Sequence, residues 1–456
     1  MGSDSLTLPP WDFYNGTSGH EGKAVYLFEV TVVPTVAIET HGCKLNQADS
    51  GTLVAQFTNA GYQVVPDSEP ADVYVVNSCT VTHIADRKAR HALRAARRRN
   101  PSGMIVATGC YAERAHESLV AMGEIDLVIG NTGKDDLTSR VAEWMGEPVA
   151  HGGYETALAG ASAIRSRAMV KIQEGCDQVC AYCIVPKVRG RERSIPQPTL
   201  VKLVNEHVSR GCKEVVLTGT QLGSYGFDIP DTSLTGMLSG LLLNTNVPRL
   251  RVSSLQAQEI NWELLDLWDD PRLCRHFHLA LQSGSDAVLA RMRRRYDATE
   301  YQEAVGKIRD VLPGASITTD VIVGFPGESD ADFQQTLDLC DRIGFAAVHA
   351  FPYSVRPGTS AAYLQDRVSS ETKSERMKAL LEASKRHASA YRAGIVGETR
   401  SVLWEGRRST PDGKVWSGLT GDYVRVVTHS SRLLANEITG VLLLGQKDEF
   451  MAAEVA

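Results

Sequence analysis

The chain has 456 residues, of which 43% are hydrophobic and 22% are charged. This balance is typical of folded globular proteins and excludes disordered, collagen-like and disulfide-scaffold chains. At about 150 residues per domain, the length predicts roughly three domains. The 48 basic and 54 acidic side chains give a net charge of −6, which excludes a globally basic nucleic-acid binder but not a locally basic face. No apolar run reaches the length of a membrane span and we find no secretory signal, so we expect a cytoplasmic protein with no membrane partner.

The first third of the chain predicts an extension followed by an open sheet. Residues 1–34 are rich in Pro, Gly and Ser without helical or strand periodicity, so we expect an N-terminal extension. Residues 35–150 alternate short apolar runs with helical segments, a pattern that predicts an open parallel α/β sheet. The apolar runs lie at 35–40, 72–78, 103–109 and 125–130.

The rest of the chain predicts two further units, which makes the fold class α/β. A small-residue-rich linker is expected at 151–163. Residues 164–394 again alternate strands and helices, which predicts a partial (βα)6 barrel, since a full eight-strand barrel needs about 250 residues. Residues 395–456 are β-rich with glycine punctuation and predict a small antiparallel β-barrel. The six strands of the partial barrel are expected at 169–175, 214–219, 249–255, 276–282, 316–324 and 347–353.

The most specific local motif is a cysteine triad, Cys176, Cys180 and Cys183, with the spacing C-x₃-C-x₂-C. Three thiolates this close in sequence can bind one iron–sulfur cluster if the chain loops around it. A structural zinc site instead takes four protein ligands, usually in paired C-x₂-C units, and no fourth ligand is nearby. Zinc and reduced core cysteines are the alternatives. A cluster with only three protein ligands leaves one iron open to a substrate or cofactor.

A second triad is dispersed along the chain. Cys43, Cys79 and Cys110 each lie just after a predicted strand. Because the carboxyl ends of parallel strands lie along one edge, where ligands bind, we expect these thiols to meet in a second metal site. Three buried structural thiols are the alternative. The remaining cysteines show no such arrangement and are expected in the core: Cys212, Cys274 and Cys340.

Basic side chains gather in three runs despite the negative net charge, at 87–99, 185–193 and 291–295. Such runs are often solvated helix faces. Their positions beside the predicted site loops also favour contact with RNA phosphates. In the C-terminal unit, we expect three aromatic residues to stack on RNA bases: Trp404, Trp416 and Tyr423.

These motifs resemble those of the radical S-adenosylmethionine methylthiotransferases, from about residue 35 to the end. The resemblance rests on HGCKLNQADS (41–50), NSCTVT (77–82), TGCYAER (108–114), EGCDQVCAYCIVPKVRGRERS (174–194), LALQSGS (279–285), TTDVIVGFPGE (318–328) and FPYSVRPGTSAA (351–362). Within the family, GCKLNQ, LTGTQLGSYG (217–226) and FPYSVRPGT are most similar to the type that acts on N6-threonylcarbamoyladenosine in tRNA.

The resemblance implies two 4Fe-4S clusters, one at each cysteine triad, and S-adenosylmethionine as cofactor. The cluster at the 176–183 motif would cleave S-adenosylmethionine to start a radical reaction at C2 of adenosine. The dispersed triad would hold the sulfur and deliver a methylthio group. The implied partners are the anticodon stem-loop of tRNA, bound partly by a TRAM-like C-terminal barrel, and a reductant such as flavodoxin or ferredoxin.

Five further residues are expected near S-adenosylmethionine, although each could equally serve a turn or strand: Tyr182, Gly219, Gln282, Ser283 and Gly324. Three other functions are kept open. The substrate could be N6-isopentenyladenosine in tRNA or a side chain of a ribosomal protein. A non-enzymatic iron–sulfur RNA-binding sensor is the alternative from another class.

Overall fold

The computed structural model describes residues 33–146, 166–410 and 413–455. The predicted linker at 151–163 and nearly all of the predicted extension lie outside these ranges. The described residues from Pro34 onward belong to one compact unit. Within the described ranges, no helix is long and apolar enough to cross a membrane.

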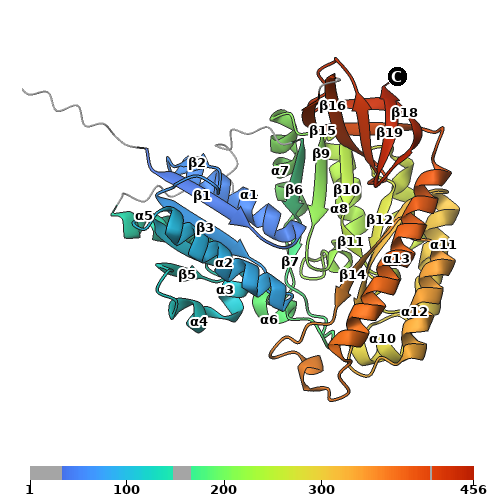
Figure 1. The fold of residues 1–456 in the computed structure, drawn as a ribbon. Helices are drawn as coiled ribbons and strands as arrows, with labels where there is room; N and C mark the ends of the chain where they lie inside the picture. The colour runs from blue at the N-terminus through green and yellow to red at the C-terminus, as the bar shows by residue number, and fades with distance from the viewer. Residues whose placement is uncertain (1–32, 147–165, 411–412, 456) are drawn as a thin grey trace, which may run out of the picture. The chain divides into compact units, whose positions relative to one another are not determined.

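The first described segment folds into a five-stranded parallel sheet of order β2-β1-β3-β4-β5 (Figure 1). Its strands are β1 (Thr35–Thr40), β2 (Gln63–Val65), β3 (Val73–Ser78), β4 (Met104–Gly109) and β5 (Leu127–Ile129). Strand β2 was not predicted: its three residues are largely exposed and form no buried apolar run. The helices are α1 (Lys44–Asn59), α2 (His83–Arg99), α3 (Cys110–Arg114), α4 (His116–Val120) and α5 (Leu137–Met145).

Both faces of this sheet are covered, which explains why its strands read as unbroken apolar runs. Alternate residues of a strand point to opposite faces. Val73 and Val75 therefore join one core with α1 and α5, whereas Tyr74 and Val76 join another with α2. All carboxyl ends of the strands consequently lie at one edge, between the two helical layers.

The central region is an open succession of six strand positions in two sheets, β10-β9-β6 and β11-β12-β13-β14, whose pairings are all parallel. The strands are β6 (Arg167–Lys171), β9 (Glu214–Thr218), β10 (Arg249–Val252), β11 (Ser254–Leu255), β12 (His276–Leu279), β13 (Ser316–Val323) and β14 (Ala347–Pro352). The expected strand at 249–255 is divided at Ser253, whose N–H bonds to the Leu217 carbonyl of β9 at 3.1 Å. A separate ribbon pairs β7 (Gln173–Glu174) with β8 (Arg193–Ser194).

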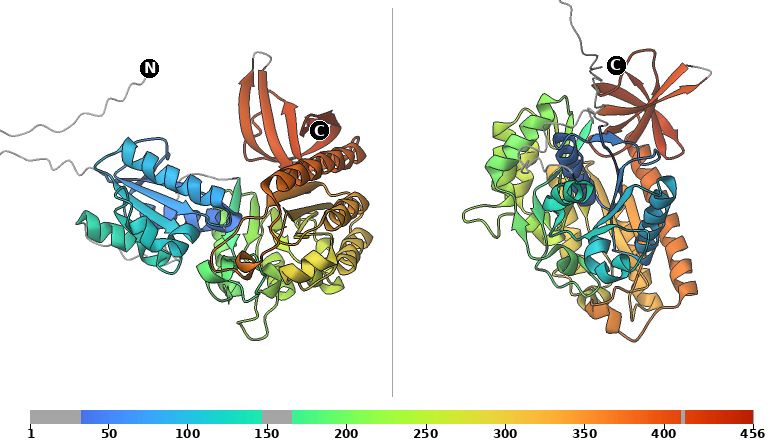
Figure 2. Two further views of the ribbon diagram at one scale, coloured as in Figure 1. Left: turned by 60° about the horizontal axis from the view of Figure 1, so that its bottom comes forward. Right: turned by 90° about the vertical axis from the view of Figure 1, so that its left-hand side faces the viewer.

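Helices separate these strands and cover their outer face (Figures 1 and 2). They are α6 (Val185–Arg189), α7 (Gln197–Ser209), α8 (Leu234–Asn244), α9 (Trp262–Leu265), α10 (Asp286–Met292), α11 (Ala298–Val311), α12 (Asp330–Ile343) and α13 (Ser370–Gly394). Ala55 of α1 belongs to the same core cluster as Ala168 of β6. The N-terminal sheet therefore packs through α1 along the edge strand of the central region. Cys212, Cys274 and Cys340 are all buried, as predicted.

The C-terminal strands close into a barrel of order β15-β16-β17-β19-β18, adjoining α13 (Figure 2). They are β15 (Thr399–Thr410), β16 (Gly413–Thr420), β17 (Arg425–His429), β18 (Ile438–Lys447) and β19 (Phe450–Val455). The expectation of a wholly antiparallel barrel is corrected at one junction, because β17 and β19 pair in parallel. The expected RNA-stacking role of two aromatic residues is also wrong: Trp404 and Trp416 are 0% and 1% exposed and fill the barrel core.

Candidate active site

The dispersed cysteines occupy equivalent places at the carboxyl edge of the N-terminal sheet. Cys43 caps the start of α1, Cys79 directly follows β3, and Cys110 is the first residue of α3 after β4. Cys79 and Cys110 are buried, whereas Cys43 is exposed. All three line one cavity of about 790 Å³. The structure thus brings together three thiols that lie on separate loops.

Glycine lets two of these loops approach each other closely. Gly42 has φ +101°, and a Cβ built on it would lie 2.6 Å from the Cβ of Cys79 and 3.0 Å from its Sγ. A side chain at this position would combine a strained backbone with a clash against a proposed ligand. The Gly-Cys pair at 42–43 is therefore a steric requirement of the thiol arrangement.

The cavity extends well beyond the thiols. Its wall also includes the strand-end residues Thr218 and Gly219, and the paired His278 and Asp320, whose Nε2 and Oδ2 atoms lie 3.3 Å apart. The C-terminal barrel contributes Tyr423, whose ring stacks on His276 with centroids 4.9 Å apart. Tyr423 thus faces the cavity, unlike the two barrel tryptophans.

The local triad lies on the loop between β7 and α6. Gly175, with φ +77°, brings this loop against the backbone of Arg191, where no side chain fits. The N–H of Cys176 bonds to the Gly190 carbonyl at 3.1 Å, and the N–H of Cys183 bonds to the Cys180 carbonyl at 3.1 Å. None of these three thiols lines the large cavity, but α6 reaches it through Val185 and Arg189. Residues Ile184 and Val188 pack on Cys110, so the two triads are neighbours across α6.

Burial favours the protonated form of three of these six thiols. It raises the pKa of Cys79 and of Cys183 to about 12, and that of Cys176 to about 11. Metal ligation requires thiolates, so loading either triad must release protons. A buried thiol of this kind is a weak nucleophile but a competent ligand once a metal is offered.

The donors of both triads are thiols, which iron–sulfur clusters take as ligands. All nine cysteines are free thiols. Among the described residues, no three His, Cys, Asp or Glu side chains are placed to hold a single metal ion. A four-iron cluster is larger than one ion and takes each cysteine on a different iron. Thiols spread around a cavity or along a loop suit such a cluster.

The five residues expected near S-adenosylmethionine fall in different surroundings. Gly219 lines the cavity. Tyr182 is half-buried, and burial raises its pKa. Gln282 has φ +66° and exchanges backbone hydrogen bonds with β13. Ser283 is fully buried, with its Oγ 3.3 Å from the Thr336 hydroxyl.

Gly324 also lies away from the large cavity. It has φ +74°, its N–H bonds to Glu328 at 2.7 Å, and the stem of Lys373 covers it. Neither Ser283 nor Gly324 lines the large cavity. Their roles toward the cofactor stay predictions.

Sequence reasoning missed a buried polar cluster beside the local triad. Arg294 donates from Nη1 to the Cys180 sulfur at 3.3 Å and from Nη2 to Gln256 Oε1 at 2.9 Å. Gln221 bridges Gln256 and Glu259 by short hydrogen bonds. Burial raises the pKa of Glu259 to about 7. These groups lie beside Cys180 of the local triad.

The basic runs divide between interior and surface. Arg294 belongs to the 291–295 run and Arg189 to the 185–193 run, and both donate hydrogen bonds to groups inside the protein instead of lying on an open surface. On α2, Arg87, Lys88 and Arg98 are exposed. Helix α2 begins at His83, four residues after Cys79, so these cations lie on an element that leads from the candidate site.

Two family models match the chain: the uncharacterized protein family UPF0004 over residues 35–130 and the radical SAM superfamily over residues 170–340. The threonylcarbamoyladenosine tRNA methylthiotransferase MtaB of Bacillus subtilis is 35% identical over 422 residues, which are 90% of this chain and 94% of the relative. MtaB of Thermotoga maritima is 39% identical, covering 81% and 86% of the two chains. The tRNA-2-methylthio-N(6)-dimethylallyladenosine synthase of Geobacter metallireducens is 35% identical, covering 82% and 88%.

Solved structures share the fold. The radical S-adenosylmethionine methyltransferase TsrM of Kitasatospora setae, with tryptophan and a S-adenosylmethionine analogue bound, superposes with a TM-score of 0.54 at 13% identity. The match covers 72% of this chain and 75% of TsrM. At this identity the likeness concerns the fold, and the chemistry has to be argued from side chains.

Proposed function

Because the chain belongs to the radical S-adenosylmethionine methylthiotransferase family, we propose that it inserts a methylthio group at C2 of N6-threonylcarbamoyladenosine next to the tRNA anticodon. The reaction uses two S-adenosylmethionine-dependent steps and a 4Fe-4S cluster at each cysteine triad. We assign sulfur insertion to residues 35–150, cofactor cleavage to 164–394 and RNA binding to 395–456. The anticodon stem-loop is the substrate, and a protein such as flavodoxin or ferredoxin supplies electrons.

Two neighbouring sites of three thiols each are the observation that carries this proposal. A cluster with an open iron supplies a binding place for S-adenosylmethionine and the electron that cleaves it. The chain itself supplies position: Arg294 holds the Cys180 loop, and the packing of Cys110 on Ile184 and Val188 keeps the second triad close. Such proximity is what a reaction between two bound groups requires.

The choice of substrate is supported by a cation in the cavity. Lys44, directly after Cys43, lines the cavity with its Nζ 5.6 Å from the Tyr423 ring centroid. It has no carboxylate ion-pair partner among the described residues. A threonylcarbamoyl group carries a carboxylate that can pair with this ammonium, whereas an isopentenyl group is apolar and offers no anion.

The test is mass spectrometry of nucleosides after incubating reconstituted, reduced protein with stem-loops that carry either modified adenosine. We expect methylthiolation of the threonylcarbamoyl substrate. Cys180→Ala should abolish cleavage of S-adenosylmethionine, and Cys79→Ala should keep cleavage but stop sulfur insertion. Product only from the isopentenyl stem-loop would overturn the substrate assignment. Full product formation by Cys79→Ala would overturn the second cluster.

A further inference from the structure

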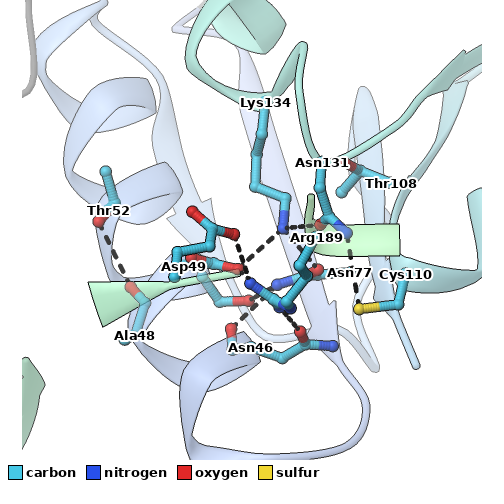
Figure 3. A network of polar contacts seen from close by, with 12 residues as sticks. Asn46, Ala48, Asp49, Thr52, Asn77, Thr108, Cys110, Asn131, Lys134 and Arg189 are labelled. Carbon is cyan, nitrogen blue, oxygen red and sulfur yellow. Dashed lines mark hydrogen bonds and ion pairs between the residues drawn. The ribbon is translucent and has the colours of Figure 1, made fainter. Parts of the chain in front are cut away.

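Three asparagines hold the loops of the dispersed triad (Figure 3). Asn46 donates from Nδ2 to the carbonyls of His41 at 2.7 Å and Ser78 at 3.1 Å, so it joins the segments that lead to Cys43 and Cys79. Asn77 donates from Nδ2 to the Asn46 carbonyl at 2.9 Å. The Asn46 side chain therefore connects two of the three cysteine loops, and the Asn77 side chain holds the backbone of Asn46.

The third asparagine reaches both the remaining cysteine and α6. Asn131 Nδ2 lies 3.6 Å from the Cys110 sulfur and donates to the Val188 carbonyl at 2.6 Å. Val188 is the residue before Arg189 and lies in the helix that follows the local triad. Asn131 thus contacts one proposed ligand directly and ties it to the element next to the other site.

Buried cations bind the asparagine carbonyls (Figure 3). Arg189 donates from Nη2 to Asn46 Oδ1 by a short hydrogen bond and to Asp49 Oδ2 at 3.1 Å. Lys134 Nζ bonds to Asn131 Oδ1 at 2.9 Å and to Asp49 Oδ2 at 2.9 Å. Asp49 is therefore the common anchor of both cations, and every asparagine in the set is connected to it.

Arg189 also reaches back toward the local triad. Its Nη1 donates to Glu174 Oε1 at 2.7 Å, and Glu174 lies two residues before Cys176. The planar guanidinium thus links the strand that leads into one triad with the helix that follows the other. The Arg189 side chain is 2% exposed, so these bonds are largely shielded from water.

We propose that Arg189 and Asn131 are positioning residues that fix the separation of the two cysteine triads. The inference rests on the proposed function, in which a radical formed at one triad and sulfur held at the other must meet at the same adenosine carbon. Neither residue needs to touch the substrate for this role. Loosening either should leave cofactor cleavage intact and uncouple it from sulfur insertion.

The test compares Arg189→Gln and Asn131→Ala with wild type. Each protein is reconstituted with iron and sulfide, and 5′-deoxyadenosine and methylthiolated nucleoside are quantified together. We expect deoxyadenosine per product to rise by about 10- to 100-fold, the usual effect of losing a partner that orients ligands, while cleavage itself changes less than about threefold. Arg189→Lys keeps the positive charge but loses the planar guanidinium with its several donors. Cofactor cleavage should therefore remain uncoupled from sulfur insertion in this variant.

A second readout does not depend on activity. In a background of Cys176→Ala, Cys180→Ala and Cys183→Ala, only the dispersed triad can hold a cluster. Asn131→Ala should shift the reduction potential and the electron paramagnetic resonance of that cluster, because hydrogen bonds to ligand sulfurs set the potential. Iron absent from this background would overturn both the second cluster and the inference.

A matched control separates positioning from general stability. Arg272 also bridges backbone segments, donating to the carbonyls of Thr245 at 2.8 Å and Leu242 at 2.7 Å, but it does not line the cavity. Arg272→Gln should keep the wild-type product ratio. If Arg189→Gln and Asn131→Ala match this control in product ratio, or if Arg189→Lys couples as well as wild type, the positioning role is wrong while the proposed function stands.

Discussion

Replacing Lys44 by Gln tests whether the cavity selects its substrate by charge. The side chain is half-buried, lines the cavity beside Cys43, and faces the ring of Tyr423. Burial lowers the pKa of Lys44, which shows that the ammonium is partly removed from water and would gain from an anion. Gln keeps much of the length and polarity of the side chain and removes its charge.

The magnitude follows from the position of the ammonium. Two unit charges about 4 Å apart attract by about 4 kcal/mol at an effective dielectric constant of about 20. Desolvation cancels part of this, and hydrogen bonds to charged groups typically keep about 1.5–3 kcal/mol. At about 1.4 kcal/mol per factor of ten, kcat/KM for the threonylcarbamoyl stem-loop should fall by roughly 10- to 150-fold. Turnover of an isopentenyl stem-loop, which offers no carboxylate, should change by less than about threefold.

The assay is a competition between the two stem-loops in one reaction, with products resolved by mass spectrometry. Arg425→Gln is the matched control, because Arg425 is an exposed cation at the mouth of the same cavity. A cation that binds phosphate should affect both stem-loops equally. If Lys44→Gln lost the same activity on both stem-loops, or lost none, selection through the carboxylate of the substrate would be refuted.

Two further predictions concern stability. Burial raises the pKa of Glu259 from its ordinary 4.5 to about 7, so the folded protein keeps a proton that the unfolded chain releases, and stability falls as pH rises across that interval. The stability of Glu259→Gln relative to wild type should therefore rise between about pH 5 and pH 7.5, by at most about 3 kcal/mol of unfolding free energy. A difference in unfolding midpoints between the two proteins that does not change with pH contradicts this. Trp404→Ala should cost about 3–5 kcal/mol of unfolding free energy in denaturant titrations, because the ring is fully buried in the barrel. If Trp404→Ala kept the stability of wild type but bound RNA more weakly, Trp404 would instead belong to the RNA-binding surface.

The sequence predicted the strands best where both faces of a sheet are covered. Strands β3 and β4 are buried at every position, so they read as apolar runs whatever their neighbours are. The strands that were missed carry weaker signals. Strand β19 (FMAAEV) is rich in alanine, and β16 (GKVWSGLT) contains two glycines, residues that strands use rarely.

The two-residue alternation of side chains along a strand would have predicted the position of Trp404. Val402 and Trp404 lie two residues apart on β15, so they share a face, and both are fully buried. An aromatic residue in phase with an apolar β-branched neighbour favours a core position. Tyr423, outside any strand and with φ +69°, has no such phase and lines the cavity.

The cysteines were predictable from topology, but their supports were not. Parallel strands bring their ends to one edge, which places Cys43, Cys79 and Cys110 without any knowledge of side-chain contacts. Arg189 sits in a run that reads as a solvated basic patch, and its partner Asp49 lies 140 residues earlier in the chain. Charge patterning along a sequence cannot distinguish a solvated arginine from one whose carboxylate arrives through folding.

Under the proposed function, the substrate is selected at the cavity to which all three regions of the fold contribute residues. The radical S-adenosylmethionine fold is shared with TsrM at 13% identity, so the fold alone does not choose a substrate. The cavity wall combines Cys43 and Lys44 of the N-terminal sheet, His278 at a central strand and Tyr423 of the C-terminal barrel. A substrate that fills this space contacts all three at once. The response of activity to the N6 group of the substrate should therefore depend on Lys44. Its response to the distance between the substrate and the thiols should depend on Arg189.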